Sequence, residues 1–129
     1  MKKKYLIVVA DYYKNITKGL LESSLKLIPK SSSIKIIRVP GVFEIPVTIS
    51  KNIKRYDAFL ALGCVIKGQT PHFDFISQAS TNAIMDLSVL NKKPIGNGII
   101  TCLNMKQAKA RKKKGAEAAD AVNSVLSQK

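Results

Sequence analysis

The chain has 129 residues, 46% of them hydrophobic, and no apolar run is as long as the roughly 18 to 20 residues of a membrane span, so we predict one globular domain over residues 1–129. The formal net charge of +14 leaves nucleic acid, a membrane surface or an anionic small molecule open as partners. Most cations are scattered lysines and no stretch interleaves aromatic and basic residues, so we expect a solvated lysine-rich surface and neither nucleic acid nor membrane as partner.

The first third of the chain alternates strand and helix. Residues 5–10 (YLIVVA) form a β-branched apolar run, which predicts a strand buried on both faces. Asp11 ends this run, so we interpret the basic N-terminus and the run as a strand rather than an export signal, and we expect a cytoplasmic protein. Apolar residues at helical spacing predict a helix over residues 15–28 with Asn15 as its N-cap, and residues 33–39 (SIKIIRV) predict a second strand.

The rest of the chain repeats this alternation. A turn at residues 40–41 precedes a short helix expected over residues 43–53, in which Pro46 is tolerated only near the first turn. Residues 57–67 predict the most apolar strand, residues 71–91 a long helix, and residues 92–103 contain a fourth strand. The remainder is expected to be helical with a break near Gly115. The order βαβαβαβα predicts an α/β fold: a three-layer αβα sandwich with a four-stranded parallel sheet.

The two cysteines, Cys64 and Cys102, each lie in an apolar strand-like run. Because the chain has only these two cysteines and one histidine, His72, we expect no zinc site and interpret both cysteines as small buried thiols.

In such sheets ligands bind beyond the C-terminal ends of the strands, so we expect chemistry from the loops at residues 11–13, 40–43, 67–72 and 101–104. In the third loop, Gly68 allows close approach of the backbone, Thr70 is a plausible N-cap, and Pro71 suits the first helical position. A helix start attracts anions, and His72 beside it has a side chain suited to proton transfer near neutral pH. Taken alone, this pattern also fits a helix start with a surface histidine.

The other loops each allow two interpretations. Glu44 either decorates a helix start or accepts hydrogen bonds from a polyol or amine ligand. Tyr12 and Tyr13 are adjacent. Either one of their rings stacks on a flat ligand, or both rings cover the edge of the sheet. Arg111 is either one cation among several lysines or the bidentate partner of a phosphate.

Together these stretches resemble the lumazine synthase family, from residue 6 to about residue 125. The strongest matches are PGVFEIP (residues 40–46), ALGCVIKGQTPHFDFI (61–76), and a pattern running from Gly98 and Thr101 through Gln107 to Arg111. The resemblance implies a transferase that condenses 5-amino-6-(ribitylamino)uracil with 3,4-dihydroxy-2-butanone 4-phosphate, without metal or organic cofactor. It also implies the flavodoxin-like type of αβα sandwich, and a homopentamer or an assembly built from pentamers, with active sites between adjacent subunits.

The resemblance also implies a role for each matching residue. His72 corresponds to the proton-transfer histidine, Gln69 and Thr70 to the phosphate loop, and Arg111 to an arginine that binds the phosphate from the neighbouring subunit. The implied pyrimidine and ribityl contacts are Tyr12, Val42, Phe43, Glu44, Cys64, Val65 and Ile66.

Three features depart from the family pattern. Asn97 stands in the pocket wall where an aromatic or apolar residue is usual, and Tyr13 stands where an asparagine is usual. The turn between Arg111 and Gly115 is several residues shorter. Two further functions stay open: a basic binding protein on the same scaffold, and a purely structural shell protein. The presence of the site residues argues against the first, and the shortened turn argues against a full shell.

Overall fold

A four-stranded parallel sheet forms the centre of the molecule. The computed structural model describes residues 2–69 and 71–128, and Thr70 lies outside the described residues. The strands are β1 (Lys4–Ala10), β2 (Ser33–Val39), β3 (Ala58–Ile66) and β4 (Ile95–Cys102), in the spatial order β2-β1-β3-β4. All pairs are parallel, which confirms the predicted α/β class.

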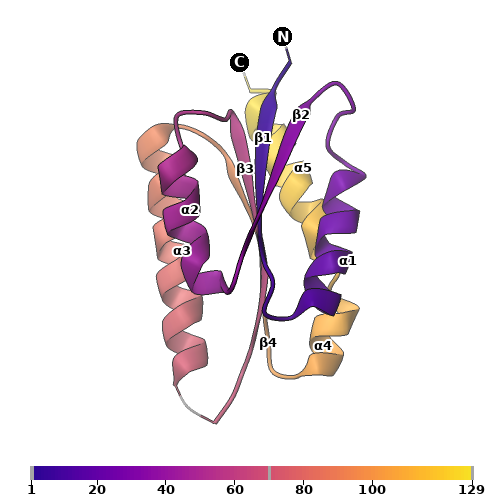
Figure 1. The fold of residues 1–129 in the computed structure, drawn as a ribbon, viewed down its shortest axis with the longest axis vertical. Coiled ribbons are helices and arrows are strands. Elements are labelled where there is room, and N and C mark those ends of the chain that lie inside the picture. The colour runs from indigo at the N-terminus through magenta and orange to yellow at the C-terminus, as the bar shows by residue number, and fades with distance from the viewer. Residues whose placement is uncertain (1, 70, 129) are drawn as a thin grey trace.

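Helices cover both faces of this sheet (Figure 1). The helices α1 (Lys14–Leu25), α4 (Met105–Ala110) and α5 (Lys114–Leu126) pack on one face. The turn η1 (Val42–Glu44) and the helices α2 (Ile45–Asn52) and α3 (His72–Asn91) pack on the other. Each face has its own apolar core, because successive residues of a strand point to opposite faces. In β1, for example, Ile7 contributes to the first core and Val8 to the second.

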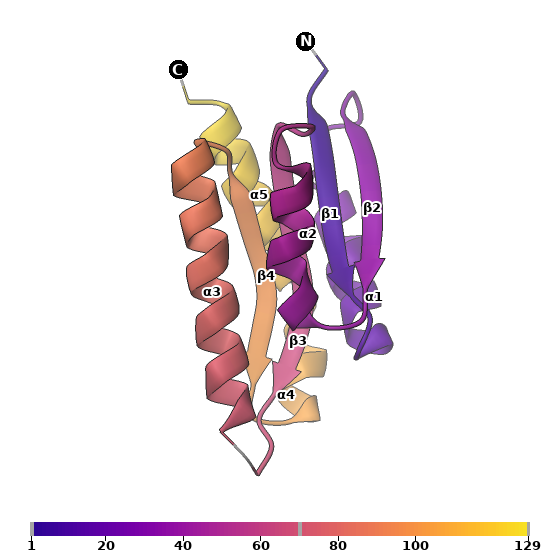
Figure 2. The ribbon, with the colours of Figure 1, turned by 60° about the vertical axis from the view of Figure 1, so that its left-hand side comes forward.

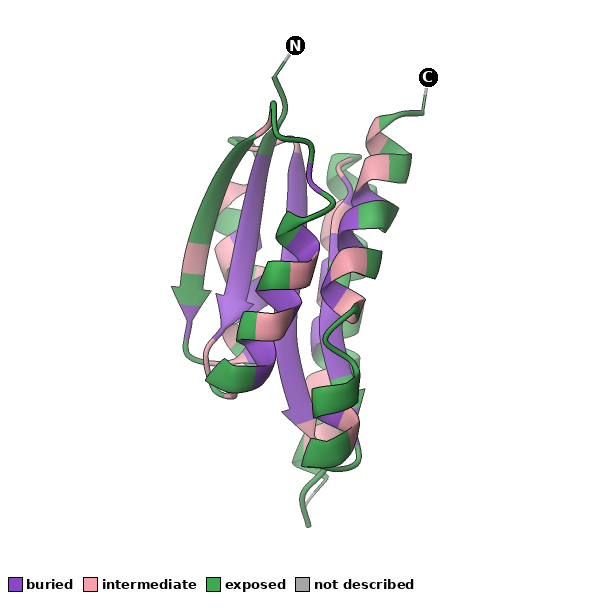
Figure 3. Cartoon of the chain, turned by 90° about the vertical axis from the view of Figure 1, so that its right-hand side faces the viewer, coloured by how far each residue is buried: buried purple, intermediate pink, exposed green. Residues whose placement is uncertain are grey.

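Burial follows the position of each strand. β1 and β3 are buried almost throughout, whereas β2 is exposed along most of its length, as Figure 3 shows. The buried central strands are the continuous apolar runs recognised in the sequence, since a strand covered on both faces carries no polar alternation.

Several element boundaries differ from the sequence predictions. α1 ends at Leu25 rather than at residue 28, and α2 covers Ile45–Asn52 rather than residues 43–53. Tyr13, not Asn15, is the N-cap residue of α1, because the Tyr13 carbonyl already accepts hydrogen bonds from the backbone N–H groups of Ile16 and Thr17. Likewise Pro71 is the N-cap residue of α3 rather than its first helical residue. The predicted break near Gly115 lies earlier, at residues 111–113. Gly115 is inside α5, where a Cβ atom would overlap the Leu20 carbonyl of α1.

β3 extends beyond β1 at its C-terminal end, and this offset positions the site. The last pair between them joins Val9 to Leu62, whereas the pairing of β3 with β4 continues to Ile66 and Cys102. In Figure 2 the lower end of β3 therefore lies beside β4 and away from β1. The edge of β3 that β1 leaves uncovered faces the loops that follow β1 and β2.

Candidate active site

A cavity of about 540 Å³ lies at this uncovered end of β3, and we call it the strand-end cavity. Its volume suits a small-molecule ligand, and it lies where parallel α/β sheets bind ligands. Among the residues named from the sequence as site candidates, those that line it are Tyr12, Val42, Phe43, Cys64, Val65, Ile66 and His72. Segments far apart in the sequence thus meet at one place.

His72 is the first residue of α3, so its imidazole lies in the first turn of the helix and in the cavity wall. Helix α3 is 20 residues long, and its N-terminus presents unpaired backbone N–H groups and a partial positive charge. The backbone N–H of Phe75 donates to the Pro71 carbonyl at 3.2 Å, which fixes this first turn. The cavity therefore combines an imidazole side chain with a helix end that favours an anion.

The loop before α3 contributes Gly68 to the cavity wall. Gln69 is exposed beside it but is not among the lining residues that the structure describes. The adjacent Thr70, the other predicted phosphate contact, lies outside the described residues.

Glu44 shapes the loop after β2 rather than lining the cavity. Its Oε1 accepts a hydrogen bond from the backbone N–H of Gly41 at 3.0 Å, and its own N–H donates to the Gly41 carbonyl at 3.2 Å. These bonds close the turn that carries Val42 and Phe43 into the cavity wall. Gly63 of β3 permits this close packing, because a Cβ atom there would lie 2.7 Å from Cγ2 of Val42.

We expect Glu44→Ala to lower the free energy of unfolding by about 0.5–2 kcal/mol, the usual cost of losing such a capping hydrogen bond. Urea titration measures this change. Glu44→Gln is the matched control, because its side-chain oxygen still accepts from Gly41. Equal urea midpoints for wild type and Glu44→Ala would show that the Glu44 carboxylate does not hold the turn.

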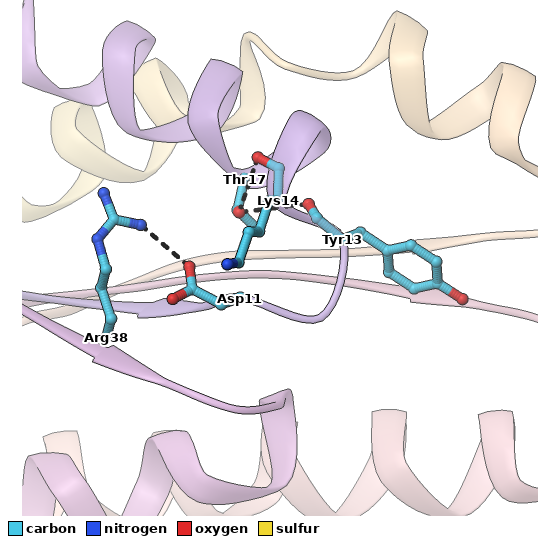
Figure 4. A network of polar contacts seen from close by, with 5 residues as sticks. All are labelled: Asp11, Tyr13, Lys14, Thr17 and Arg38. Atoms are coloured by element: carbon cyan, nitrogen blue, oxygen red, sulfur yellow. Dashed lines mark hydrogen bonds and ion pairs between the residues drawn. The ribbon is translucent and has the colours of Figure 1, made fainter.

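Two tyrosine rings follow β1. The rings of Tyr12 and Tyr13 are 4.9 Å apart and meet edge to face, at 80°. Tyr12 is 76% exposed although it lines the cavity, which leaves a ring face available for stacking. Tyr13 is partly buried and packs against the apolar core on the α1 side of the sheet, and Figure 4 shows its ring directed away from Asp11 and Arg38.

Cys64 is the buried thiol of the cavity wall. Burial raises its pKa to about 12 from the model-compound value of 9.0, and the neighbouring Cys102 thiol adds to the rise. Both cysteines are free and buried, in agreement with the sequence interpretation. At neutral pH the Cys64 thiol is therefore protonated, and it forms an apolar part of the cavity wall rather than a nucleophile.

We expect Cys64 to resist alkylation by iodoacetamide at pH 8 in the native protein and to react once guanidinium unfolds the chain. Peptide mass spectrometry reads out both states. The unfolded thiol ionises near pH 9.0 and the folded one only near pH 12. The contribution of the neutral Cys64 thiol to the free energy of unfolding is therefore fully present below pH 9. It is lost as the pH rises from 9.0 to about 12. Rapid labelling of Cys64 in the native protein would contradict its burial.

Asn97 and Arg111 do not line the strand-end cavity of their own chain. Asn97 is exposed on β4, where its backbone pairs with Ala61 in the middle of β3 and its Oδ1 accepts from the N–H of Ile99 at 3.0 Å. Arg111 is exposed at the end of α4, and its Nη1 donates to the Thr101 carbonyl at 3.2 Å. A second chain must supply these groups if they act on a ligand in this cavity.

The sequence reasoning did not name two other residues of the cavity wall, Phe73 and Ile76, as ligand contacts. Phe73 and Ile76 carried a signal, since they lie one and four residues after His72 on the same helix. Their spacing was interpreted only as a buried helix face. Within residues 2–69 and 71–128, no cluster of three His, Cys, Asp or Glu side chains can hold a metal ion. No helix of this described part is long and apolar enough to cross a membrane.

The fold and the cavity define a class: an α/β protein that binds small molecules at the C-terminal edge of a parallel sheet, with a histidine and a helix N-terminus in the site. The sequence model of the family described as 6,7-dimethyl-8-ribityllumazine synthase matches residues 2–129. The chain therefore belongs to the 6,7-dimethyl-8-ribityllumazine synthase family. The membership confirms the predicted enzyme class, a transferase of riboflavin biosynthesis.

Curated relatives agree along almost the whole chain. A 6,7-dimethyl-8-ribityllumazine synthase of Bartonella tribocorum is 41% identical over all of this chain and 93% of its own length. The enzyme designated 6,7-dimethyl-8-ribityllumazine synthase 1 in Rhodopseudomonas palustris is 42% identical over 95% of this chain and 83% of its own. The synthase of Bartonella bacilliformis is 46% identical over 85% of this chain and 76% of its own.

Proposed function

We propose that the chain condenses 5-amino-6-(ribitylamino)uracil with 3,4-dihydroxy-2-butanone 4-phosphate to give 6,7-dimethyl-8-ribityllumazine, water and phosphate. Family membership supports this reaction, and the observation that carries it is that His72 lines the same cavity as Val42 and Phe43 of the PGVFEIP segment and residues 64–66 of β3.

The pyrimidine is expected to lie between Tyr12 and the uncovered edge of β3 at residues 64–66. There the aromatic ring offers a stacking surface and the strand edge offers backbone N–H and C=O groups without a β1 partner. Val42 and Phe43 are expected to contact the ribityl chain, and Glu44 is expected to support this contact by holding their turn. The cavity volume of about 540 Å³ is large enough for two small reactants together.

The phosphate is expected at the start of α3, near Gly68, Gln69 and Thr70. In the proposed sequence the amine of the pyrimidine attacks the ketone and forms an imine with loss of water. Phosphate then leaves by elimination and the resulting enol becomes a second carbonyl. The ribitylamino nitrogen attacks this carbonyl, and the ring closes with loss of a second water. His72 moves the protons that these steps require. Holding both reactants in register removes entropy from the barrier, a contribution of up to about 7–11 kcal/mol in well-oriented systems.

The direct test is to mix both substrates with the purified protein and to follow the absorbance of the lumazine product. Product formation above the uncatalysed rate is expected. A rate equal to that of the substrates alone would contradict the proposed activity.

We propose in addition that neighbouring chains of a homopentamer share the active site, with Asn97 and Arg111 serving the strand-end cavity next to them. Both side chains are exposed away from their own cavity, and Phe43 in the cavity wall is 67% exposed. Helix α3 also exposes large apolar side chains, Phe75, Met85, Val89 and Leu90, which favours burial against another subunit. Native mass spectrometry is expected to show pentamers or multiples of them, and a monomer would contradict this proposal. Cytoplasmic location stays a prediction.

A further inference from the structure

A second cavity lies beside the first, between the start of α1 and helix α4, and we call it the α1–α4 cavity. Its volume is about 480 Å³, which is within the range of small-molecule sites. Tyr12 and Tyr13 line both cavities and form the wall between them. The described residues that make up the rest of this wall have no role in the proposed reaction.

Lysines from two different helices line the α1–α4 cavity. Lys14 lies in the first turn of α1 and Lys109 in the last turn of α4, and both are exposed. Within the described part of the chain, neither amine has a carboxylate within ion-pair distance. The carboxylate that the cavity wall does contain, on Asp11, is paired with Nη1 of Arg38 at 3.0 Å (Figure 4). The cavity therefore carries an excess of positive charge.

The remaining walls suit a flat apolar group. Ile16 and Met105 line the cavity on opposite helices, together with the two tyrosine rings. Met105 is 40% exposed and Tyr12 76% exposed, so apolar and aromatic surface lies open beside the lysines. A free phosphate ion would satisfy the lysines but would leave this surface in water. A ligand that carries both a phosphate and a ring uses all of these walls.

We propose that the α1–α4 cavity binds a phosphate monoester of a flat heterocycle, the chemistry of a nucleoside monophosphate. Lys14 and Lys109 hold the phosphate from two sides, and the heterocycle lies against the tyrosine wall, Ile16 and Met105. The site is separate from the strand-end cavity and does not depend on the reaction proposed there.

Isothermal titration calorimetry of the assembled protein with adenosine 5′-monophosphate tests the site, with adenosine and inorganic phosphate as partial ligands. We expect the monophosphate to bind more tightly than either partial ligand, and to bind more weakly as salt screens the lysines. The double variant Lys14→Ala/Lys109→Ala is expected to weaken binding by about tenfold or more, because it removes both charge-assisted contacts.

The matched control is Lys18→Ala/Lys106→Ala, which removes two exposed lysines of the same helices that do not line the cavity. We expect this control to change the dissociation constant less than twofold, and both double variants to form lumazine at the wild-type rate. If the two double variants weaken monophosphate binding equally, the loss of affinity arises from net charge alone, and the proposed site is wrong. Failure of the monophosphate to bind more tightly than inorganic phosphate would overturn it as well. So would loss of binding in His72→Ala, which would place the ligand in the strand-end cavity.

Discussion

The variant His72→Ala is expected to lower the turnover number by about 10²–10⁴-fold, the usual contribution of a positioned proton-transfer group. His72 lies in the strand-end cavity at the first turn of α3, and it is the only histidine in the chain. No second imidazole can take over the proton transfer. Because the tyrosine wall, the β3 edge and the PGVFEIP turn are untouched, we expect the dissociation constant of the pyrimidine substrate to change by less than about threefold.

Steady-state kinetics and a direct binding measurement together separate these two effects. Gln78→Ala is a suitable control, since Gln78 is an exposed residue of the same helix that does not line the cavity. Circular dichroism should confirm that both variants are folded. A turnover number of His72→Ala equal to that of wild type would exclude the proton-transfer role. A parallel loss of turnover and substrate binding would indicate that His72 acts by shaping the cavity.

Much of the fold could be predicted from the sequence because its strands carry a simple signal. Strands covered on both faces are continuous apolar runs, and residues 5–10 and 57–67 were recognised on that basis. Helix starts were less predictable. α1 begins at Lys14 with no side-chain cap, so the usual signal of a capping Asn pointed to the wrong residue.

The site was predictable to the extent that it depends on strand ends. Loops after β1, β2 and β3 meet because parallel strands end at the same edge, and the sequence order alone implies this meeting. The offset between β1 and β3 was not predictable, because it depends on pairing register. That offset is what opens the β3 edge at residues 64–66. The α1–α4 cavity was also invisible, since Lys14 and Lys109 lie far apart in sequence and each resembles any other surface lysine.

Arg111 is exposed outside the strand-end cavity of its own chain, so its replacement tests whether neighbouring subunits share the site. We expect Arg111→Ala to raise the KM for the butanone phosphate by about tenfold to a hundredfold, through loss of a charge-assisted hydrogen bond to the phosphate. Arg111→Lys should recover part of this loss, because it keeps the charge but not the bidentate geometry. Lys112→Ala, at the adjacent exposed cation, is the control for net charge.

Mixing two defective variants then distinguishes a shared site from a self-contained one. His72→Ala and Arg111→Ala subunits are unfolded together at equal concentrations, refolded, and assayed at a butanone phosphate concentration too low for Arg111→Ala alone. If each cavity takes its arginine from the next chain of a ring, random assembly gives about one quarter of the sites both intact residues, and activity returns to about that fraction of refolded wild type. If each chain completes its own site, every site lacks one residue and no activity returns. Because Arg111 is turned away from the strand-end cavity of its own chain, with its guanidinium on the Thr101 carbonyl, we expect the recovery.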